Sequence, residues 1–185
     1  MDSKRVRDVS IGLVTAPVWM PLTAALAFAV WALDGRPVFF VQPRVGQGRR
    51  TFHILKLRTM TTEPDVAARR VTQVGRWLRQ RGLDELPQLF NVLHGDMSLV
   101  GPRPMTADDV ARLSAISPEF ARRLEVRPGI TGLPQVTQAR GAHLTAALDA
   151  QYARERSFLM DVGILCRTAL MNVVGKARGA RRLPV

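Results

Sequence analysis

LDELPQLFNVL, residues 83–93, is the stretch of this chain that most constrains its fold. It predicts a helix that begins at Asp84 and ends before Gly95, a typical C-terminal stop. Pro87 then falls in the first turn, where a missing backbone N–H costs nothing. The adjacent acids Asp84 and Glu85 lie where the helix dipole favours negative charge, so they act either as a cap or as a site for phosphate and a metal.

The acid pair lies in a strongly basic part of the chain. Between residues 66 and 107 there are three acids, Asp84, Glu85 and Asp96, against six arginines. The dipole at a helix start keeps Asp84 ionised, as a carboxylate nucleophile or an Mg²⁺ ligand must be. Arg103 lies in a stiff Gly-Pro-Arg-Pro loop, which suits a fixed contact to phosphate. These neighbours shift the interpretation of the pair from a cap towards an enzyme site.

The composition indicates a single domain with an anionic partner. A chain of 185 residues is long enough to bury a modest core. The formal charge is +12, and most of the basic residues are arginine, whose planar fork suits phosphate. Lipid head groups, nucleotides and nucleic acid are therefore candidate partners. One cysteine and three histidines exclude a disulfide framework and a zinc site of the usual spacing.

An uncharged apolar segment, residues 9–33, lies near the N-terminus. As one helix it would be roughly 37 Å long, enough to cross a hydrocarbon core of about 30 Å. Pro17 and Pro21 predict a sharp kink, and we expect the break at Pro21. Basic residues flank both ends, so the positive-inside rule favours a re-entrant helix that enters one leaflet, breaks and returns. A single kinked transmembrane helix is the alternative; a secretory signal fits poorly because the apolar run is too long.

The remaining pattern predicts an α+β fold that is mostly helical and has a small β-hairpin. The hairpin strands are expected at residues 38–41 and 51–57, joined by a Gly-Gln-Gly turn. Apolar residues at helical spacing predict three further helices, and stretches rich in proline, glycine or polar residues predict irregular loops. The helices are expected at residues 74–80, 107–124 and 144–174, and the loops at residues 61–70, 101–104 and 128–134.

Six sequence blocks follow one another along the chain. They are PVFF at residues 37–40, QxRxG at 42–46, FxIxKxRTM at 52–60, LDELPQLFNVL at 83–93, GDMSLVGPRP at 95–104 and RPGITG at 127–132. Together they closely resemble the bacterial sugar transferases, the monotopic polyprenyl-phosphate phosphoglycosyl transferases. The resemblance extends from about residue 4 to about residue 174, and the length is similar to that of the minimal catalytic form.

The resemblance implies a division of the chain into three parts. Residues 1–36 would form a membrane-inserted re-entrant helix, and amphipathic helices would lie at the interface. Residues 37–175 would form the cytoplasmic catalytic domain, and residues 176–185 a basic C-terminal tail.

It also implies a reaction, in which sugar-1-phosphate moves from a UDP-sugar to polyprenyl (undecaprenyl) phosphate and UMP is released. The family's acid dyad maps onto Asp84 and Glu85. Asp84 would attack the sugar-proximal phosphorus to form an aspartyl-phosphosugar intermediate, and Glu85 would support Asp84 or position a metal. Mg²⁺, bound through Asp84 and the diphosphate, would offset charge on the leaving UMP. Arg103 is the leading phosphate-binding residue; the weaker candidates, each of which has a bracing role as its alternative, are Lys56, Arg58, Arg79 and Arg127.

Two departures from the family pattern bear on these expectations. The family's re-entrant helix breaks at a Ser-Pro pair, which is Met20-Pro21 here; a serine hydroxyl can bond a carbonyl that the proline frees, and methionine cannot. After a Thr-Gly turn the family commonly has Ala-Gln-Val-Asn-Gly-Arg, whereas residues 134–140 read PQVTQAR. If that loop touches the sugar, a relative's sugar substrate does not carry over to this chain.

The expected partners are a UDP-sugar, polyprenyl phosphate and a bilayer with anionic head groups, at the cytoplasmic face of the bacterial inner membrane. The product would pass to downstream glycosyltransferases of glycan assembly. Nucleic acid is not expected, because few aromatic residues interleave with the basic ones. Two alternatives stay open: direct transfer in a ternary complex with Asp84 only as a metal ligand, and a non-catalytic basic module that binds membranes or nucleic acid.

Overall fold

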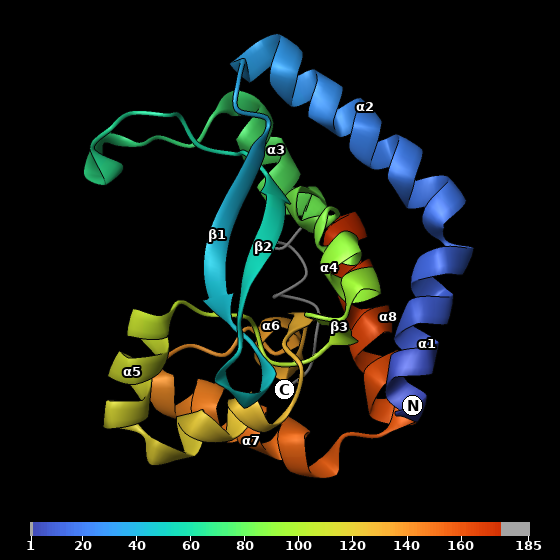
Figure 1. The fold of residues 1–185 in the computed structure, drawn as a ribbon, viewed down its shortest axis with the longest axis vertical. Coiled ribbons are helices and arrows are strands. Elements are labelled where there is room, and N and C mark those ends of the chain that lie inside the picture. The colour runs from blue at the N-terminus through green and yellow to red at the C-terminus, as the bar shows by residue number, and fades with distance from the viewer. Residues whose placement is uncertain (1, 175–185) are drawn as a thin grey trace.

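Helices make up most of the structure, and two short sheets lie among them (Figure 1). The computed structural model describes residues 2–174, so the expected basic tail, residues 176–185, lies outside the described residues. The predicted α+β class, mostly helical with a small antiparallel hairpin, is confirmed.

The antiparallel hairpin consists of β1, Phe39–Val45, and β2, Thr51–Leu57. A short 3-10 turn, Gln47–Arg49, joins the two strands where the Gly-Gln-Gly turn is predicted. β1 continues past its predicted end at residue 41 and includes Pro43. Proline is tolerated there because β1 is an edge strand, on which one face of the backbone needs no ladder partner.

A second sheet, which the sequence does not predict, pairs β3, Ser98–Val100, with β4, Gly129–Thr131, in parallel. A Cβ atom on Gly129 would lie 2.0 Å from the backbone nitrogen of Gly101, so only glycine allows the two segments to approach this closely. The irregular loop predicted over residues 128–134 therefore contains a strand. Strands of only three residues carry too little alternation to be recognised from the sequence.

The two long predicted helices are each divided in the structure. Residues 107–124 form α5, Ala107–Ile116, and the 3-10 helix η4, Pro118–Glu125; a proline disfavours helical geometry in the residue before it, which ends α5. Residues 144–174 form α7, Ala142–Glu155, and α8, Phe158–Val174. The other helices are α3, Gln73–Arg81, as predicted, α6, Leu133–Val136, and the 3-10 helix η2, Val66–Ala68, in the predicted 61–70 loop.

The acid pair does not begin an α-helix. α3 ends at Arg81 and is capped by Gly82, whose φ of 67° is left-handed, and Leu83–Glu85 then forms a 3-10 turn, η3. α4 covers Gln88–His94 and ends at the predicted glycine stop. The predicted helix start at Asp84 is therefore wrong. Pro87 has no N–H to continue an α-helical ladder from the turn, so the acids lie in the turn and not in the first turn of α4.

The apolar N-terminal segment is divided at a different residue from the predicted one. α1 covers Ser3–Val14, α2 covers Ala16–Asp34, and the break lies at Thr15. Pro17 falls at the start of α2, where its missing N–H costs nothing, whereas Pro21 lies inside α2. The prediction of a helix break at Pro21 is therefore corrected to Thr15. Local sequence offers two prolines and does not decide between them.

Trp19 braces this break. Its indole Nε1 donates a hydrogen bond of 2.9 Å to the carbonyl of Gly12, across the junction of α1 and α2. Its ring meets Phe90 of α4 edge to face, with 4.8 Å between centroids. The angle between the two helices is thus held by contacts of the buried Trp19 side chain as well as by the backbone.

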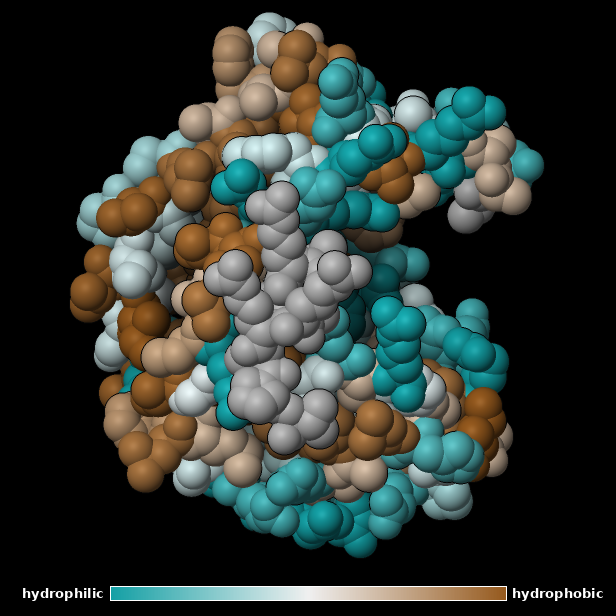
Figure 2. Space-filling view, turned by 180° about the vertical axis from the view of Figure 1, so that it is seen from behind, coloured by the Kyte–Doolittle hydropathy of each residue, from teal (hydrophilic) through white to brown (hydrophobic). Residues whose placement is uncertain are grey.

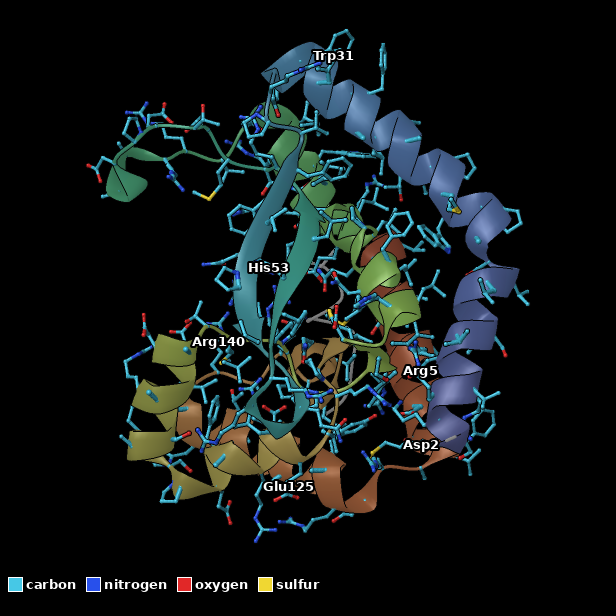
Figure 3. All side chains as sticks on the ribbon, viewed as in Figure 1. Asp2, Arg5, Trp31, His53, Glu125 and Arg140 are labelled. Atoms are coloured by element: carbon cyan, nitrogen blue, oxygen red, sulfur yellow. The ribbon has the colours of Figure 1, made fainter. Side chains whose placement is uncertain are left out.

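Most of the apolar surface of α2 is exposed, and α2 is long and apolar enough to cross a membrane. Figure 3 shows Trp31 near the C-terminal end of α2, at the outer edge of the molecule. Figure 2 shows hydrophobic side chains gathered along this side. The exposed large apolar residues of α2 are Val18, Met20, Leu22, Phe28, Trp31 and Leu33.

Polar contacts attach α1 to the rest of the molecule. Lys4 Nζ lies 2.6 Å from Asp161 Oδ2 of α8, and the Ser98 hydroxyl donates a 2.7 Å bond to Asp8 Oδ2. Arg5, labelled in Figure 3, donates to the last carbonyls of α4. Such partly buried polar contacts fix one orientation of α1, because a displaced helix would leave charges unpaired.

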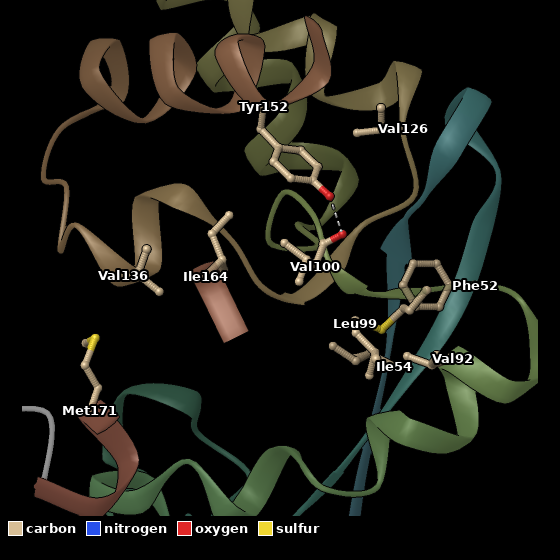
Figure 4. Packing of buried hydrophobic residues seen from close by; sticks show 11 residues of the cluster. Phe52, Ile54, Val92, Leu99, Val100, Val126, Val136, Tyr152, Ile164 and Met171 are labelled. Carbon is tan, nitrogen blue, oxygen red and sulfur yellow. Dashed lines mark hydrogen bonds between the residues drawn. The ribbon is translucent and has the colours of Figure 1, made fainter. Parts of the chain in front are cut away.

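The main hydrophobic core lies between β2, α4, β3, α7 and α8. Tyr152 is its largest fully buried side chain, and its hydroxyl lies 2.9 Å from the Val100 carbonyl (Figure 4) and 2.8 Å from Asp161 Oδ1. Burial, together with Asp161, raises the pKa of Tyr152, so the hydroxyl stays protonated. This contact links the second sheet to α8 and to the ion pair that holds α1.

Candidate active site

The turn Leu83–Glu85 brings the acid dyad against the hairpin and the Gly-Pro-Arg-Pro loop. Asp84 is buried, with 8% of its surface exposed. Glu85 Oε1 accepts hydrogen bonds from Lys56 Nζ at 2.8 Å and from Arg103 Nη2 at 2.9 Å. Four of the predicted site residues, from three distant segments of sequence, therefore meet here.

A cavity of about 680 Å³ opens beside the dyad. Its volume lies within the roughly 300–1,000 Å³ typical of small-molecule sites. Figure 2 shows a largely hydrophilic hollow between the projecting 61–70 segment and α5, on the side away from the apolar surface. Two carboxylates, Asp84 and Glu85, face six cations in its lining, which are Arg44, Lys56, Arg58, Arg69, Arg79 and Arg103. The excess of positive charge suits an anionic ligand, and arginine in particular suits phosphate.

The charge of the Lys56 amine depends on its surroundings in the cavity. Burial lowers its pKa, and Glu85 offsets part of that effect while Arg103 adds to it. A phosphate placed beside Lys56 would favour the charged form of the amine. Among the weaker candidates, Lys56 thus lines the cavity as well as bracing Glu85.

Arg58 has the opposite role, although its side chain also borders the cavity. Its Nε donates to the carbonyl of Pro37 at 2.6 Å, and its Nη2 donates to the carbonyls of Asp34 and Gly35 at the end of α2. Nη1 lies 3.3 Å from the carbonyl of Met60. The guanidinium is directed at backbone carbonyls, so this geometry favours the bracing interpretation over phosphate binding.

The two remaining predicted residues differ in position. Arg79 lines the cavity, with its Nε bonded to the Thr59 hydroxyl at 2.8 Å. Arg127 lies outside the cavity lining, and its Nη1 is 4.0 Å from Asp2 Oδ2. Because its side chain extends towards the N-terminus, the structure does not bring Arg127 together with the dyad.

Sequence reasoning missed Arg44 and Arg69 as cavity residues. Residues 40, 42 and 44 alternate along β1 and therefore share one face of the hairpin, and all three line the cavity. This alternation could have indicated from the sequence that Arg44 lies on the same face as residues 40 and 42. Burial, with Arg103 nearby, lowers the pKa of Arg44, and its Nη2 bonds Gln42 at 2.6 Å. Arg69 reaches the cavity from an irregular loop, where no sequence period applies.

Comparison with known proteins assigns the chain to a family. The model of the bacterial sugar transferases matches residues 2–175. The chain belongs to the bacterial sugar transferase family. The resemblance that the six sequence blocks indicate is thereby confirmed.

Several curated proteins are similar to this sugar transferase. A UDP-glucose:undecaprenyl-phosphate glucose-1-phosphate transferase of Caulobacter vibrioides is 44% identical over 180 residues, which cover 89% of this chain and 67% of that protein. An undecaprenyl-phosphate glucose phosphotransferase of Komagataeibacter xylinus is 39% identical over 95% of this chain and 37% of its own length. A UDP-N-acetylgalactosamine-undecaprenyl-phosphate N-acetylgalactosaminephosphotransferase of Aeromonas hydrophila is 36% identical over 93% of this chain and 44% of its own length. The chain thus spans two thirds of the first relative and less than half of the other two.

The residues of this sugar transferase fit Mg²⁺ when a phosphate ligand is present. Among residues 2–174, no group of three or more His, Cys, Asp or Glu side chains is placed to hold a metal ion alone. Mg²⁺ characteristically uses one or two carboxylates together with substrate phosphates and water. Asp84 and Glu85 provide two carboxylates at one cation-lined cavity and so fit that pattern.

A buried ion pair supports the loop that carries Arg103 in the sugar transferase. Arg123 donates through Nη2 to the carbonyl of Arg103, and its Nη1 lies 3.4 Å from Asp149 Oδ2. Both side chains are almost completely buried. Burial raises the pKa of Asp149 to about 6, and the charge of Arg123 offsets only part of the rise.

This pKa predicts a pH-dependent stability. Because the folded-state pKa exceeds the unfolded value of 3.8, folding takes up a proton, and the stabilisation is lost as the pH rises through about 6. We expect the thermal midpoint of the wild type, minus that of Asp149→Asn, to be larger at about pH 5 than at about pH 7.5. Thermal denaturation of both proteins in the same detergent measures this difference. A difference that stays constant with pH would show an Asp149 that is ionised throughout.

Proposed function

We propose that this sugar transferase moves sugar-1-phosphate from a UDP-sugar to polyprenyl phosphate and releases UMP. The observation that carries the proposal is the Asp84-Glu85 pair inside a cation-rich cavity of nucleotide size, in a chain with a helix apolar enough for a membrane. The curated relatives are named for transfers of this kind between UDP-sugars and undecaprenyl phosphate. We propose no particular sugar from their names.

The reaction proceeds in two displacements at one phosphorus atom. An oxygen of Asp84 attacks the sugar-proximal phosphorus, a new O–P bond forms, and the bond from that phosphorus to the bridging oxygen breaks. UMP leaves with the bridging oxygen and its electron pair. A phosphate oxygen of polyprenyl phosphate then attacks the aspartyl-phosphosugar, and Asp84 leaves as a carboxylate. Two bulky anions therefore never need to react in one step.

The surrounding residues hold charge in place during these steps. Lys56 and Arg103 share Glu85 Oε1, so the dyad carboxylate is fixed by two cations that also face the cavity. Arg79 and Arg44 add positive charge along the walls, where the diphosphate would lie. Mg²⁺ held by Asp84 and the diphosphate would supply further neutralisation of the leaving phosphate.

We propose that α1 and α2 form a re-entrant membrane element with the catalytic part on the cytoplasmic face. Lys4 and Asp8 at the start of α1 contact the globular part, and Asp34 at the end of α2 is bonded by Thr72 and Arg58. Both ends of the helix pair are attached to the same folded unit. If the C-terminal end of α2 lay on the opposite face of the membrane, one of these two sets of contacts would be broken. Single cysteines placed before residue 9 and after residue 33 should be labelled from the same face; labelling from opposite faces would overturn re-entry.

A UMP-release screen tests the function. The purified protein in detergent or nanodiscs receives Mg²⁺, polyprenyl phosphate and, one at a time, a panel of UDP-sugars. We expect lipid-dependent steady-state release of UMP and a lipid-linked sugar diphosphate for at least one donor. That product is a substrate of the kind that downstream glycosyltransferases extend. Absence of turnover with every donor, alongside tight binding to anionic vesicles, would favour a non-catalytic membrane-binding module.

A further inference from the structure

A second, smaller cavity of about 270 Å³ lies beyond the Glu85–Arg103 pair. Glu85 and Arg103 line both this cavity and the larger one, so the two cavities meet at this ion pair, next to Asp84 in the sequence. Apart from that shared pair, the described residues of the smaller cavity carry no charge. Its polar residues are amides and hydroxyls, namely Thr131, Gln135, Gln138, Thr168 and Asn172.

The two cavities therefore suit chemically different parts of one ligand. The larger one concentrates arginine and lysine, which suits a diphosphate. The smaller one offers neutral donors and acceptors beside a few apolar side chains, which suits a neutral group rich in hydroxyls. A sugar joined to the phosphorus at the dyad is such a group, and its position next to that phosphorus matches the adjacency of the cavities.

The side-chain amide of Gln135, in the lining of this cavity, makes no hydrogen bond to the described residues. Its Oε1 and Nε2 are both buried, and neither has a hydrogen-bond partner among the described residues. α6 holds the residue directly after the Thr131-Gly132 turn, with Oε1 close to Gly132. An amide buried without partners destabilises the ligand-free protein, because both of its polar atoms have lost water. A ligand that donates to Oε1 and accepts from Nε2 would remove that cost.

We propose that the smaller cavity binds the sugar ring of the nucleotide sugar and that the amide of Gln135 recognises its hydroxyl groups. The inference rests on the proposed function, since it places one half of the same donor. Gln135 itself matches the glutamine of the family's Ala-Gln-Val, and among the residues that depart from the family's common sequence Gln138 also lines this cavity. A site built to hydrogen-bond a hydroxyl discriminates strongly against a sugar that lacks it or points it elsewhere.

The test compares ligand-free stability with sugar-dependent affinity in Gln135→Met, a substitution of similar volume. Binding of UDP, UDP-glucose and UDP-N-acetylgalactosamine to the full chain in detergent is measured by calorimetry. Every protein in this binding experiment also carries Asp84→Asn, so that no phosphosugar adduct forms. We expect the Kd of the variant for UDP to lie within about twofold of the wild-type value. The ratio by which the preferred sugar tightens binding over UDP alone should be roughly tenfold smaller in the variant. The thermal midpoint without ligand should not fall, because the lost amide made no hydrogen bond. Gln151→Met on α7, where the glutamine bonds Glu155 at 3.0 Å, is the matched control and should leave both affinities unchanged.

A second readout is the ratio of kcat/KM between sugar epimers, which should change in Gln135→Met without a change in UDP affinity. Equal loss of UDP and UDP-sugar binding in Gln135→Met, a lowered thermal midpoint, or an unchanged sugar contribution would each overturn the inference. So would a wild type in which no sugar adds affinity to UDP. Because binding is measured without turnover, these outcomes are distinct from failure of the proposed function, in which the wild type releases no UMP from any donor.

Discussion

Asp84→Asn should abolish both lipid-linked product formation and the covalent adduct. The amide keeps the shape of the side chain but is a poor nucleophile towards phosphorus, so we expect turnover to fall by at least about a thousandfold. The decisive measurement omits the lipid acceptor: wild-type protein with a UDP-sugar and Mg²⁺ should gain the mass of one phosphosugar and release about one equivalent of UMP. The variant should do neither.

Asp96→Asn is the matched control for this experiment. Asp96 is the third acid of the same arginine-rich stretch, but it lies outside the cavity lining and 3.0 Å from His94 Nδ1. The Asp96→Asn variant should still form the phosphosugar adduct. If the wild type forms UMP only after polyprenyl phosphate is added and never gains mass, the transfer is direct and Asp84 is at most a metal ligand.

Arg58→Ala should cause the largest loss of stability among the cavity arginines. It removes charge-assisted bonds to the partly buried carbonyls at and just after the end of α2, and carbonyls left unpaired there lose a strong donor without full access to water. We expect the free energy of unfolding to fall by about 3 kcal/mol or more, a drop in thermal midpoint on the order of 10 °C. Arg58→Lys should recover little, since an ammonium cannot reproduce the planar fork. Thermal denaturation in one detergent, with light scattering to detect aggregation, measures both variants.

Arg69→Ala is the comparison, because Arg69 also borders the cavity but lies on an exposed loop, bonded to the Glu63 carbonyl. Its thermal midpoint should stay within about 2 °C of the wild type. At temperatures where Arg58→Ala is still folded, its KM for the UDP-sugar should be close to the wild-type value. A normal midpoint combined with a strongly raised KM would instead identify Arg58 as a phosphate ligand.

Much of this arrangement follows from local sequence. The period of two in residues 51–57, the glycine stops at Gly82 and Gly95, and the apolar run of residues 9–33 each predict an element that the structure contains. The dyad and Arg103 could be associated in advance because acids are scarce in that part of the chain and its proline-rich loop is stiff. These are short-range signals, and each is fixed by a few neighbouring residues.

The rest depends on contacts between distant segments. Lys56 and Arg58 lie two residues apart, yet Lys56 meets the dyad while Arg58, just past the end of β2, turns to the end of α2. No local pattern distinguishes them, because the difference is decided by where α2 ends in space. The parallel pairing of β3 with β4 likewise depends on a close approach of Gly101 and Gly129 across the chain.

The contacts of Arg58 couple the position of the apolar helix α2 to the shape of the cavity wall. The same guanidinium joins the end of the apolar helix to the wall of the cation-lined cavity. Lys4 attaches the N-terminal end of α1 to Asp161 of α8. The helix pair is therefore held to the globular part at both of its ends. The distance between a bilayer that holds α2 and the dyad is then a fixed dimension of the protein. We therefore expect the depth at which a lipid phosphate would meet Asp84 to be set by the protein and not by the thickness of the bilayer.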